Sequence, residues 1–596
     1  MKHDPRIAKY PLTREQSVFV SVWFNMTYAH SLDSHRVRVM HGVNILEELT
    51  RLMNVSHAST EDRWMVAREA IGILESEAAL KRPVFANATH NIGALLTKSF
   101  GNKADKAALE KGRPLLESHM REYLHLLHQH YIDEVITGLQ DAVLAPVARA
   151  EADRFQEIRS LTGSLISRLI ARGQSIEGLF QLYRQVLVPL KPPKKAYVFA
   201  QRFDLLRKLI TAESRTWRAS FAIDGVTDAK SFPGKIGDIA FHQDAPDGVS
   251  VFPGMKEQGH RLFAQGEADA IDARTAGQLL HERINRVLDL VRFEYDRANI
   301  TVSDHFVIAQ ATGGDLRLLP IPKVVPNPQS SVSSAELDAF ARNVGRLVTG
   351  ERFASEGRDR VLAAFRLYRT GADTTSFENK LVNWWTALEF LAKGNGGSGD
   401  IGDLVEKSVT PVLMGVSVVN HLTAYREMLL ELSVELVEPA TNQAIALKEL
   451  NFAELYAVLA QPEHRQTIND RLRDLPLTQM RFDQFMHYLA SPADMQAFLG
   501  RVEQGLRWHL QRIYRARCDI VHSAGRMLNI ALLCANLEAY LKSVLTALLA
   551  AFGRVPTLAS PTEFFLRAEH TYANAKDRLG QRDPAALKAY LIELKH

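Results

Sequence analysis

The stretch FENKLVNWWTALEFLAKG (residues 377–394) sets the fold class of the C-terminal third of this chain. Its apolar residues recur at helical spacing and share one broad face: Leu381, Trp384, Trp385, Leu388 and Leu391. A helix with tryptophans and leucines on one side must pack that side against other elements. We therefore predict a buried helix here, within a bundle of helices.

The segments on either side of this helix continue the helical pattern. RVLAAFRLYRTGA (360–372) precedes it, and GRMLNIALLCANLEAYLKSVLTALLAAFG (525–553) follows after a long insert. The second of these has an apolar stripe of Leu533, Leu537, Leu541, Val544 and Leu548. Glu538 and Lys542 interrupt it, and a membrane span tolerates such charges poorly. A buried helix is the better prediction.

The whole chain is predicted to be mainly α, with a small central α+β domain. Helical patterns fill residues 59–82, 107–148, 151–172 and 176–188. TWRASFAID and IGDIAFHQD alternate as strands do, and HFVIAQATGGDLRLLPIP predicts a hairpin around Gly313 and Gly314. Pro192 with Pro193, and the Pro/Ser-rich segment 324–334, are expected linkers. The expected regions are 1–196 (N-terminal helical), 197–330 (α+β), 331–560 (C-terminal helical) and 561–596 (helical tail).

Composition limits the class of protein. The chain has 596 residues and a net charge of only +4, so a surface for nucleic acid would have to be a local patch. Its two cysteines exclude a disulfide framework and a cysteine-built zinc site, and they fit a reducing compartment. The first residues contain no apolar signal-peptide segment. We expect a cytoplasmic protein with no membrane association.

The candidate functional motif is RIYRARCDIVHSAGR (512–526), in which Arg517 and His522 lie five positions apart. The chain contains a second Arg-x4-His pair, Arg36 and His41, and about two would arise by chance, so spacing alone carries no information. Residues five apart on a helix point about 140° away from each other. Both can serve one site only if the helix ends or bends between them, or if a second chain completes the site.

The order of the segments around this motif resembles the HEPN superfamily, and within it the ApeA-like branch of bacterial anti-phage defence. Such domains have a helix with an alE motif, a variable insert, and then lY-x-x-R-S-x-I-V-H-G before a closing helix. The matching positions cover about residues 355–555 and include Glu389, Tyr514, Arg517, Ile520, Val521 and His522. Cys518 stands where the family usually has Asn, Asp or Ser, and Ser523 where it usually has Gly.

The resemblance implies a metal-independent endoribonuclease, a toxin of abortive infection, that needs no cofactor. Arg517 and His522 would be catalytic, and four residues would support them. Glu389 would be a partner of Arg517 and Asp519 a replacement polar contact, with Cys518 and Tyr514 nearby. RNA supplies its own nucleophile, the 2′-OH. His522 would transfer protons and Arg517 would stabilise the charged phosphate, giving a 2′,3′-cyclic phosphate. Three flanking arginines would hold RNA phosphates: Arg512, Arg515 and Arg526.

HEPN domains commonly pair, so the implied assembly is a homodimer that acts on RNA, with tRNA as one candidate. Residues 1–330 would sense infection, restrain the nuclease or bind a defence partner protein. The alternative is a non-catalytic HEPN-like subunit that binds a nucleotide or a partner within a larger defence complex. Arg517 and His522 would then be a structural polar pair at a helix end.

One further cluster contains residue types that can bind a metal. His125 and His128 lie one helical turn apart, with Glu122 and Asp133 nearby. Such a group can bind zinc or iron, but a solvated helix face explains it better. We expect no metal.

Overall fold

Helices make up most of the chain, and the predicted fold class is confirmed: the protein is mainly α with a small antiparallel sheet. The computed structural model describes residues 3–28, 31, 40–55, 59–101, 106–190, 197–226, 230, 232–245, 262–295, 300–321, 334–349, 355–394, 400–523 and 530–581. These residues form two compact units. Unit 1 combines residues 1–165 with 325–596, and unit 2 is residues 166–324.

This division differs from the four regions expected from the sequence. The boundary near residue 165 falls inside a helix rather than at the proline-rich segment near 192. The N-terminal and C-terminal helices belong to one unit because helices from the two ends of the chain pack together, as described below. Pro192 and Pro193 lie outside the described residues, and so does the expected linker at 324–334 except for Ser334, which begins α11.

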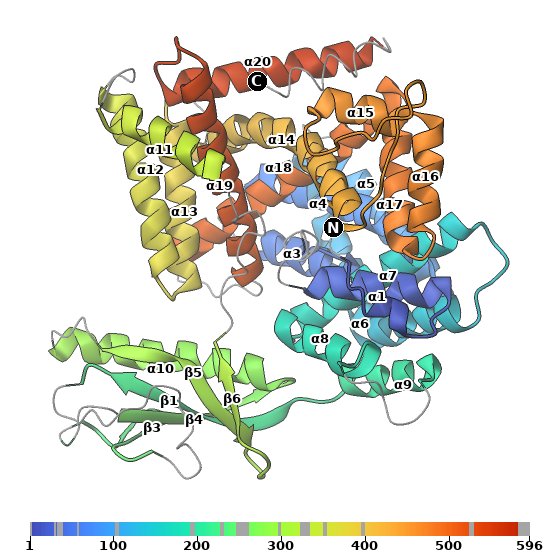
Figure 1. Ribbon diagram of the computed structural model, residues 1–596. Coiled ribbons are helices and arrows are strands. Elements are labelled where there is room, and N and C mark those ends of the chain that lie inside the picture. Colours follow the sequence, from blue (N-terminus) through green and yellow to red (C-terminus); the bar gives the residue numbers. More distant parts are fainter. Residues whose placement is uncertain are drawn as a thin grey trace. The chain divides into compact units, whose positions relative to one another are not determined.

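Unit 2 is built on a six-stranded antiparallel sheet in the order β2-β3-β4-β1-β5-β6, with one long helix, α10 (Ala273–Tyr295), packed on it (Figure 1). The strands are β1 (Arg215–Asp224), β2 (Lys235–Ile236), β3 (Ile239–His242), β4 (Leu262–Ala270), β5 (Thr301–Gln310) and β6 (Arg317–Pro320). The predicted hairpin at Gly313 is the β5–β6 pair. Gly277 of α10 has no room for a side chain, because a Cβ there would lie 2.1 Å from the ring of Phe306 on β5. This glycine lets the helix approach the sheet.

The remaining helices of unit 2 precede the sheet. They are α8 (Ile176–Leu182), a π-helical turn η3 (Tyr183–Leu187) and α9 (Phe199–Ile210). The core of the sheet and α10 is separate from those of unit 1, and it centres on Phe221 stacked on Phe306 with ring centroids 5.3 Å apart.

The N-terminal part of unit 1 is a group of helices, and one of them, α4, lies in the helical run predicted at 59–82. Ser59 caps α4, and its side chain and that of Asp62 exchange hydrogen bonds with each other's backbone N–H. The elements are η1 (Ile7–Lys9), α1 (Arg14–Thr27), α3 (Gly42–Asn54), α4 (Thr60–Ser76), η2 (Ala78–Lys81), α5 (Pro83–Phe100), α6 (Lys106–Leu144) and α7 (Glu151–Ala171), which continues into unit 2.

The C-terminal part of unit 1 contains the buried helix predicted at 377–394, which is α13. Its apolar face is buried as predicted, and it packs against α12, α18 and α19 (Figure 1). The elements are α11 (Ser334–Thr349), α12 (Ser355–Asp373), α13 (Phe377–Ala392), α14 (Ile401–Glu431), α15 (Phe452–Ala460), α16 (Pro462–Leu472), α17 (Pro476–Tyr488), α18 (Pro492–Ser523), α19 (Ile530–Arg554) and α20 (Pro561–Gly580).

Two of these helices bear on the sequence predictions. Among the described helices, α19 alone is long and apolar enough to cross a membrane, and 61% of its most apolar stretch is buried, as in the core helix of a folded domain. The whole predicted stripe of α19 is buried. The described part of the expected tail at 561–596 is α20, and it is not separate: its Tyr572, Ala575 and Leu579 join the core formed by the insert helices α14–α17.

Candidate functional site around Arg517 and His522

Helix α18 carries both residues of the candidate motif in one uninterrupted run. It spans Pro492–Ser523, so it does not end between Arg517 and His522. At about 100° per residue, the two side chains leave the helix about 140° apart. The single chain therefore does not bring them together, and each has its own surroundings.

Arg517 faces α13. Its Nη2 lies 3.6 Å from Oε1 of Glu389, and the two side chains are only 21% and 14% exposed. The indole Nε1 of Trp385 donates to the same carboxylate oxygen at 2.8 Å. Burial raises the pKa of Glu389, while the Arg517 guanidinium opposes that rise. The contact between Glu389 and Arg517 that the resemblance implied is present.

Tyr514 and Cys518 flank Arg517 on the same side of α18. The ring of Tyr514 stacks on Trp385 with centroids 5.5 Å apart, and its hydroxyl donates to Asp400 at 2.7 Å. Burial and the neighbouring Asp400 raise the pKa of Tyr514. Burial also raises the pKa of the Cys518 thiol, although Tyr514 and Arg517 oppose it. Cys518 is thus a neutral neighbour of Arg517, and a thiolate nucleophile is not favoured there.

The opposite side of α18 binds α3 and α4 through buried ion pairs. Arg512 Nε lies 2.9 Å from Glu48, and its Nη2 pairs with Glu69. Arg515 reaches the second oxygen of Glu48 at 2.8 Å and Asp62 at 3.4 Å. The side chains of both arginines are less than 10% exposed, at 6% and 9%.

This arrangement corrects the prediction that Arg512 and Arg515 hold RNA phosphates. Both arginines are occupied by carboxylates from the N-terminal helices, and neither reaches the surface of the chain. Burial alone would raise the pKa of Glu48, but the two arginines lower it to about 2, so this carboxylate is ionised at neutral pH. Arg526, the third predicted phosphate ligand, lies outside the described residues.

Asp519 and His522 continue the same face of α18. The Asp519 carboxylate, expected to supply a polar contact in the site, instead pairs with Arg51 of α3 at 2.6 Å. His522 lies in the last turn of α18 and is exposed. The carboxylates of α3 and α4 could not be found from sequence, because they lie more than 440 positions before their partners in the chain.

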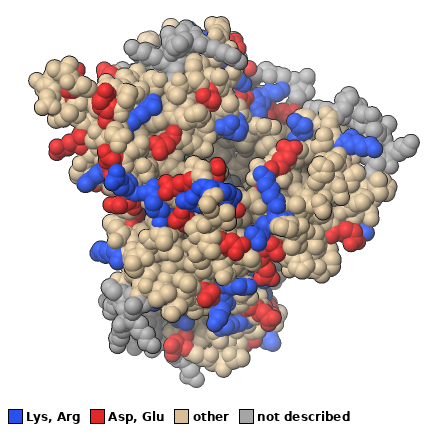
Figure 2. Space-filling model, turned by 90° about the vertical axis from the view of Figure 1, so that its right-hand side faces the viewer, with Lys and Arg blue, Asp and Glu red and all other residues tan. Residues whose placement is uncertain are grey.

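The other candidate sites are weaker. His128 Nε2 lies 2.7 Å from Glu47, and His125 bonds Gln129 on its own helix. Among the described residues, no group of three or more histidine, cysteine or acidic side chains is arranged to hold a metal. Figure 2 shows Lys and Arg side chains interspersed with Asp and Glu over one face of the molecule. Such mixed charge gives that face no broad field for attracting polyanions.

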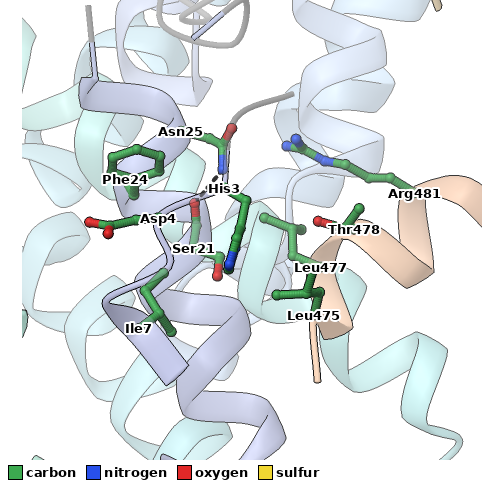
Figure 3. A pocket seen from close by; sticks show the side chains of 10 residues that line it. All are labelled: His3, Asp4, Ile7, Ser21, Phe24, Asn25, Leu475, Leu477, Thr478 and Arg481. Carbon is green, nitrogen blue, oxygen red and sulfur yellow. Dashed lines mark hydrogen bonds between the residues drawn. The ribbon is translucent and has the colours of Figure 1, made fainter. Parts of the chain in front are cut away.

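One small cavity lies between the N-terminal segment with α1 and the start of α17 (Figure 3). Its volume is about 10 Å³, which suits at most one water molecule. The lining residues are His3, Asp4, Ile7, Ser21, Phe24, Asn25, Leu475, Leu477, Thr478 and Arg481. None of them belongs to the candidate motif.

A comparison with known proteins returns no matching family model, no matching curated protein and no matching solved structure.

Proposed function

We propose that this protein is a HEPN-type, metal-independent endoribonuclease of cytoplasmic anti-phage defence. The observation that carries the proposal is the contact between Glu389 of α13 and Arg517 of α18. These are the two positions that the resemblance pairs, and they come from helices separated by the insert. Trp385 donates a hydrogen bond to Glu389, and Tyr514 stacks on the ring of Trp385.

The chemistry needs Arg517 and His522 at one phosphodiester. His522 takes the proton of the 2′-OH or gives one to the leaving 5′-oxygen, and Arg517 stabilises the extra charge of the transition state. Because the two side chains diverge on α18, we place Arg517 of one subunit and His522 of a second in each site. A twofold homodimer would contain two such sites.

Cleavage of total RNA and tRNA in EDTA tests the proposal. We expect His522→Ala and Arg517→Ala each to reduce cleavage by at least about 100-fold, the usual contribution of an acid–base group. Products should carry 2′,3′-cyclic phosphate ends. Cleavage that requires magnesium, or that persists in both variants, would reject the mechanism.

Mixing the two inactive variants tests the shared site. Half of a random mixture is heterodimer, and each heterodimer has one intact Arg517–His522 site. The mixture should therefore recover up to about one quarter of wild-type activity. If Arg517 and His522 act within one subunit instead, the mixture stays inactive.

A non-catalytic binding subunit is the second candidate. It is favoured by the divergence of Arg517 and His522 and by the carboxylates that neutralise Arg512 and Arg515. In that case the purified protein cleaves no RNA in any buffer but co-purifies with a stoichiometric partner.

A further inference from the structure

One face of α18 joins the candidate site to the N-terminal helices. Arg512, Arg515, Asp519 and His522 follow the spacing i, i+3, i+7 and i+10, which places them within an arc of about 80°. Arg517 lies on the far side of the helix. The exposed histidine thus shares its face with three charged residues that all bind α3 or α4.

We call the contact of α18 with α3 and α4 the joint, and ion pairs hold it together. Glu48 sits at its centre and bridges both arginines, while Arg51 and Asp519 close it at the rim, where Arg51 is 44% exposed. Buried ion pairs give specific geometry but little net stability compared with apolar packing. An interface of this kind opens more readily than an apolar core, particularly when a competing anion is present.

The chemistry of the joint matches that of a phosphate-binding surface. Paired arginines on one helix face bind carboxylates and phosphates by the same charge-assisted, forked hydrogen bonds. The carboxylates of Glu48, Glu69 and Asp62 take up these bonds within the chain.

We propose that α3 and α4 are an internal acidic clamp that competes with the RNA backbone for the Arg512–Arg515 face of α18. This inference deepens the proposed function by assigning a control to the same site. Docking of the clamp and binding of RNA exclude each other. Displacing the clamp uncovers both arginines beside His522.

The test compares two neighbouring glutamates of α3. Glu48→Gln removes the charge at the centre of the joint, while Glu47→Gln makes the same change at a 40%-exposed residue that contacts His128. Both are made with His522→Ala, which prevents cleavage, in buffer with EDTA. The readouts are anisotropy of a fluorescein-labelled oligouridine and hydrogen exchange of α3, α4 and α18.

We expect the Glu48→Gln protein to bind the oligouridine about tenfold more tightly than the Glu47→Gln protein, with faster exchange in α3 and in the last turns of α18. Adding Arg512→Gln and Arg515→Gln should abolish the gain. Faster exchange without tighter binding would overturn the proposal, and so would equal exchange and equal binding in the two glutamate variants.

If circular dichroism shows that the Glu48→Gln protein does not fold, a second pair of variants tests the clamp instead. Arg51→Glu repels Asp519 at the rim of the joint, and Arg68→Glu makes the same charge change at an exposed residue of α4. Tighter binding only in Arg51→Glu supports the clamp, and equal binding rejects it. Because these assays need no cleavage, a chain that binds as expected but never cuts RNA would refute the nuclease and leave the clamp standing.

Discussion

At the scale of single residues, the surroundings of Arg517 depend on a close approach. Gly402, in the first turn of α14, has no room for a side chain, because a Cβ there would lie 2.3 Å from the ring of Tyr514. That ring stacks on Trp385, which in turn donates to Glu389. A side chain at Gly402 would therefore displace the ring of Tyr514, and through Trp385 it would shift the carboxylate that contacts Arg517.

We predict that Gly402→Ala destabilises the protein by about 1–3 kcal/mol in urea denaturation, since overpacking outweighs the better helix propensity of alanine. Gly500→Ala, at an exposed position of α18 with open space around it, is the matched control. It should be neutral or stabilise by up to about 1 kcal/mol. Equal effects at the two positions would contradict the close approach.

His509 predicts a pH dependence. Burial, and then the nearby Arg512, lower its pKa from 6.5 to about 3, and its Nδ1 lies 2.8 Å from the hydroxyl of Tyr540. Between these two values only the unfolded chain binds the proton, so stability falls as the pH drops below about 6.5. The loss grows by at most about 1.4 kcal/mol per pH unit, or about 2 kcal/mol at pH 5.

His509→Asn should therefore flatten the fall in stability between about pH 7 and about pH 5, measured by urea denaturation at each pH. The same substitution at the exposed His570 serves as control. Acid sensitivity that is unchanged by His509→Asn would show that other groups cause it.

At the scale of elements, one arginine of a neighbouring helix caps the C-terminal end of α13. Arg360 of α12 donates to the backbone carbonyls of Phe390 at 2.9 Å and Leu391 at 2.8 Å, and also to that of Lys393. These carbonyls have no partners within the helix, so a cation there satisfies them and complements the helix dipole.

Arg360→Met keeps the aliphatic length and removes these bonds. We predict a loss of about 1–3 kcal/mol, because each such hydrogen bond contributes about 1 kcal/mol. Arg366→Met, an exposed residue of the same helix, should change stability by less than about 0.5 kcal/mol. Thermal unfolding followed by circular dichroism compares the two, and equal losses would argue against the cap.

The elements themselves were largely predictable, because amphipathic spacing and capping residues are local signals. Within the helical run predicted at 59–82, α4 begins after its N-cap Ser59 but already ends at Ser76. The burial of Trp384 and Trp385 follows from their spacing. The partners of α18 were not predictable. Arg512 reads as a solvated cation in sequence, and only the docking of α3 and α4 makes it a buried one.

At the scale of the whole molecule, the two units have separate cores. The core of unit 2 consists of residues from the sheet and α10, and that of the insert consists of residues from α14–α18 and α20. Because their cores are separate, the two units can unfold independently of each other.

Gly277→Ala tests this separation, since it crowds Phe306 between α10 and β5. We expect faster hydrogen exchange in β1, β4, β5 and α10, and unchanged exchange in α13 and α18. Exchange that rises in both units together would show that the cores unfold as one.

The length of α18 has a mechanical consequence. Met495 and Leu499, near its start, are buried in the core of the insert, and His522 stands at its other end. The 32 residues of the helix form a rod about 48 Å long. A ligand that tilts α18 by about 5° about its N-terminal end displaces its C-terminal end by about 4 Å. The insert can thus influence the position of the imidazole from a distance, and the ion pairs of Arg512 and Arg515 with α3 and α4 resist such a tilt.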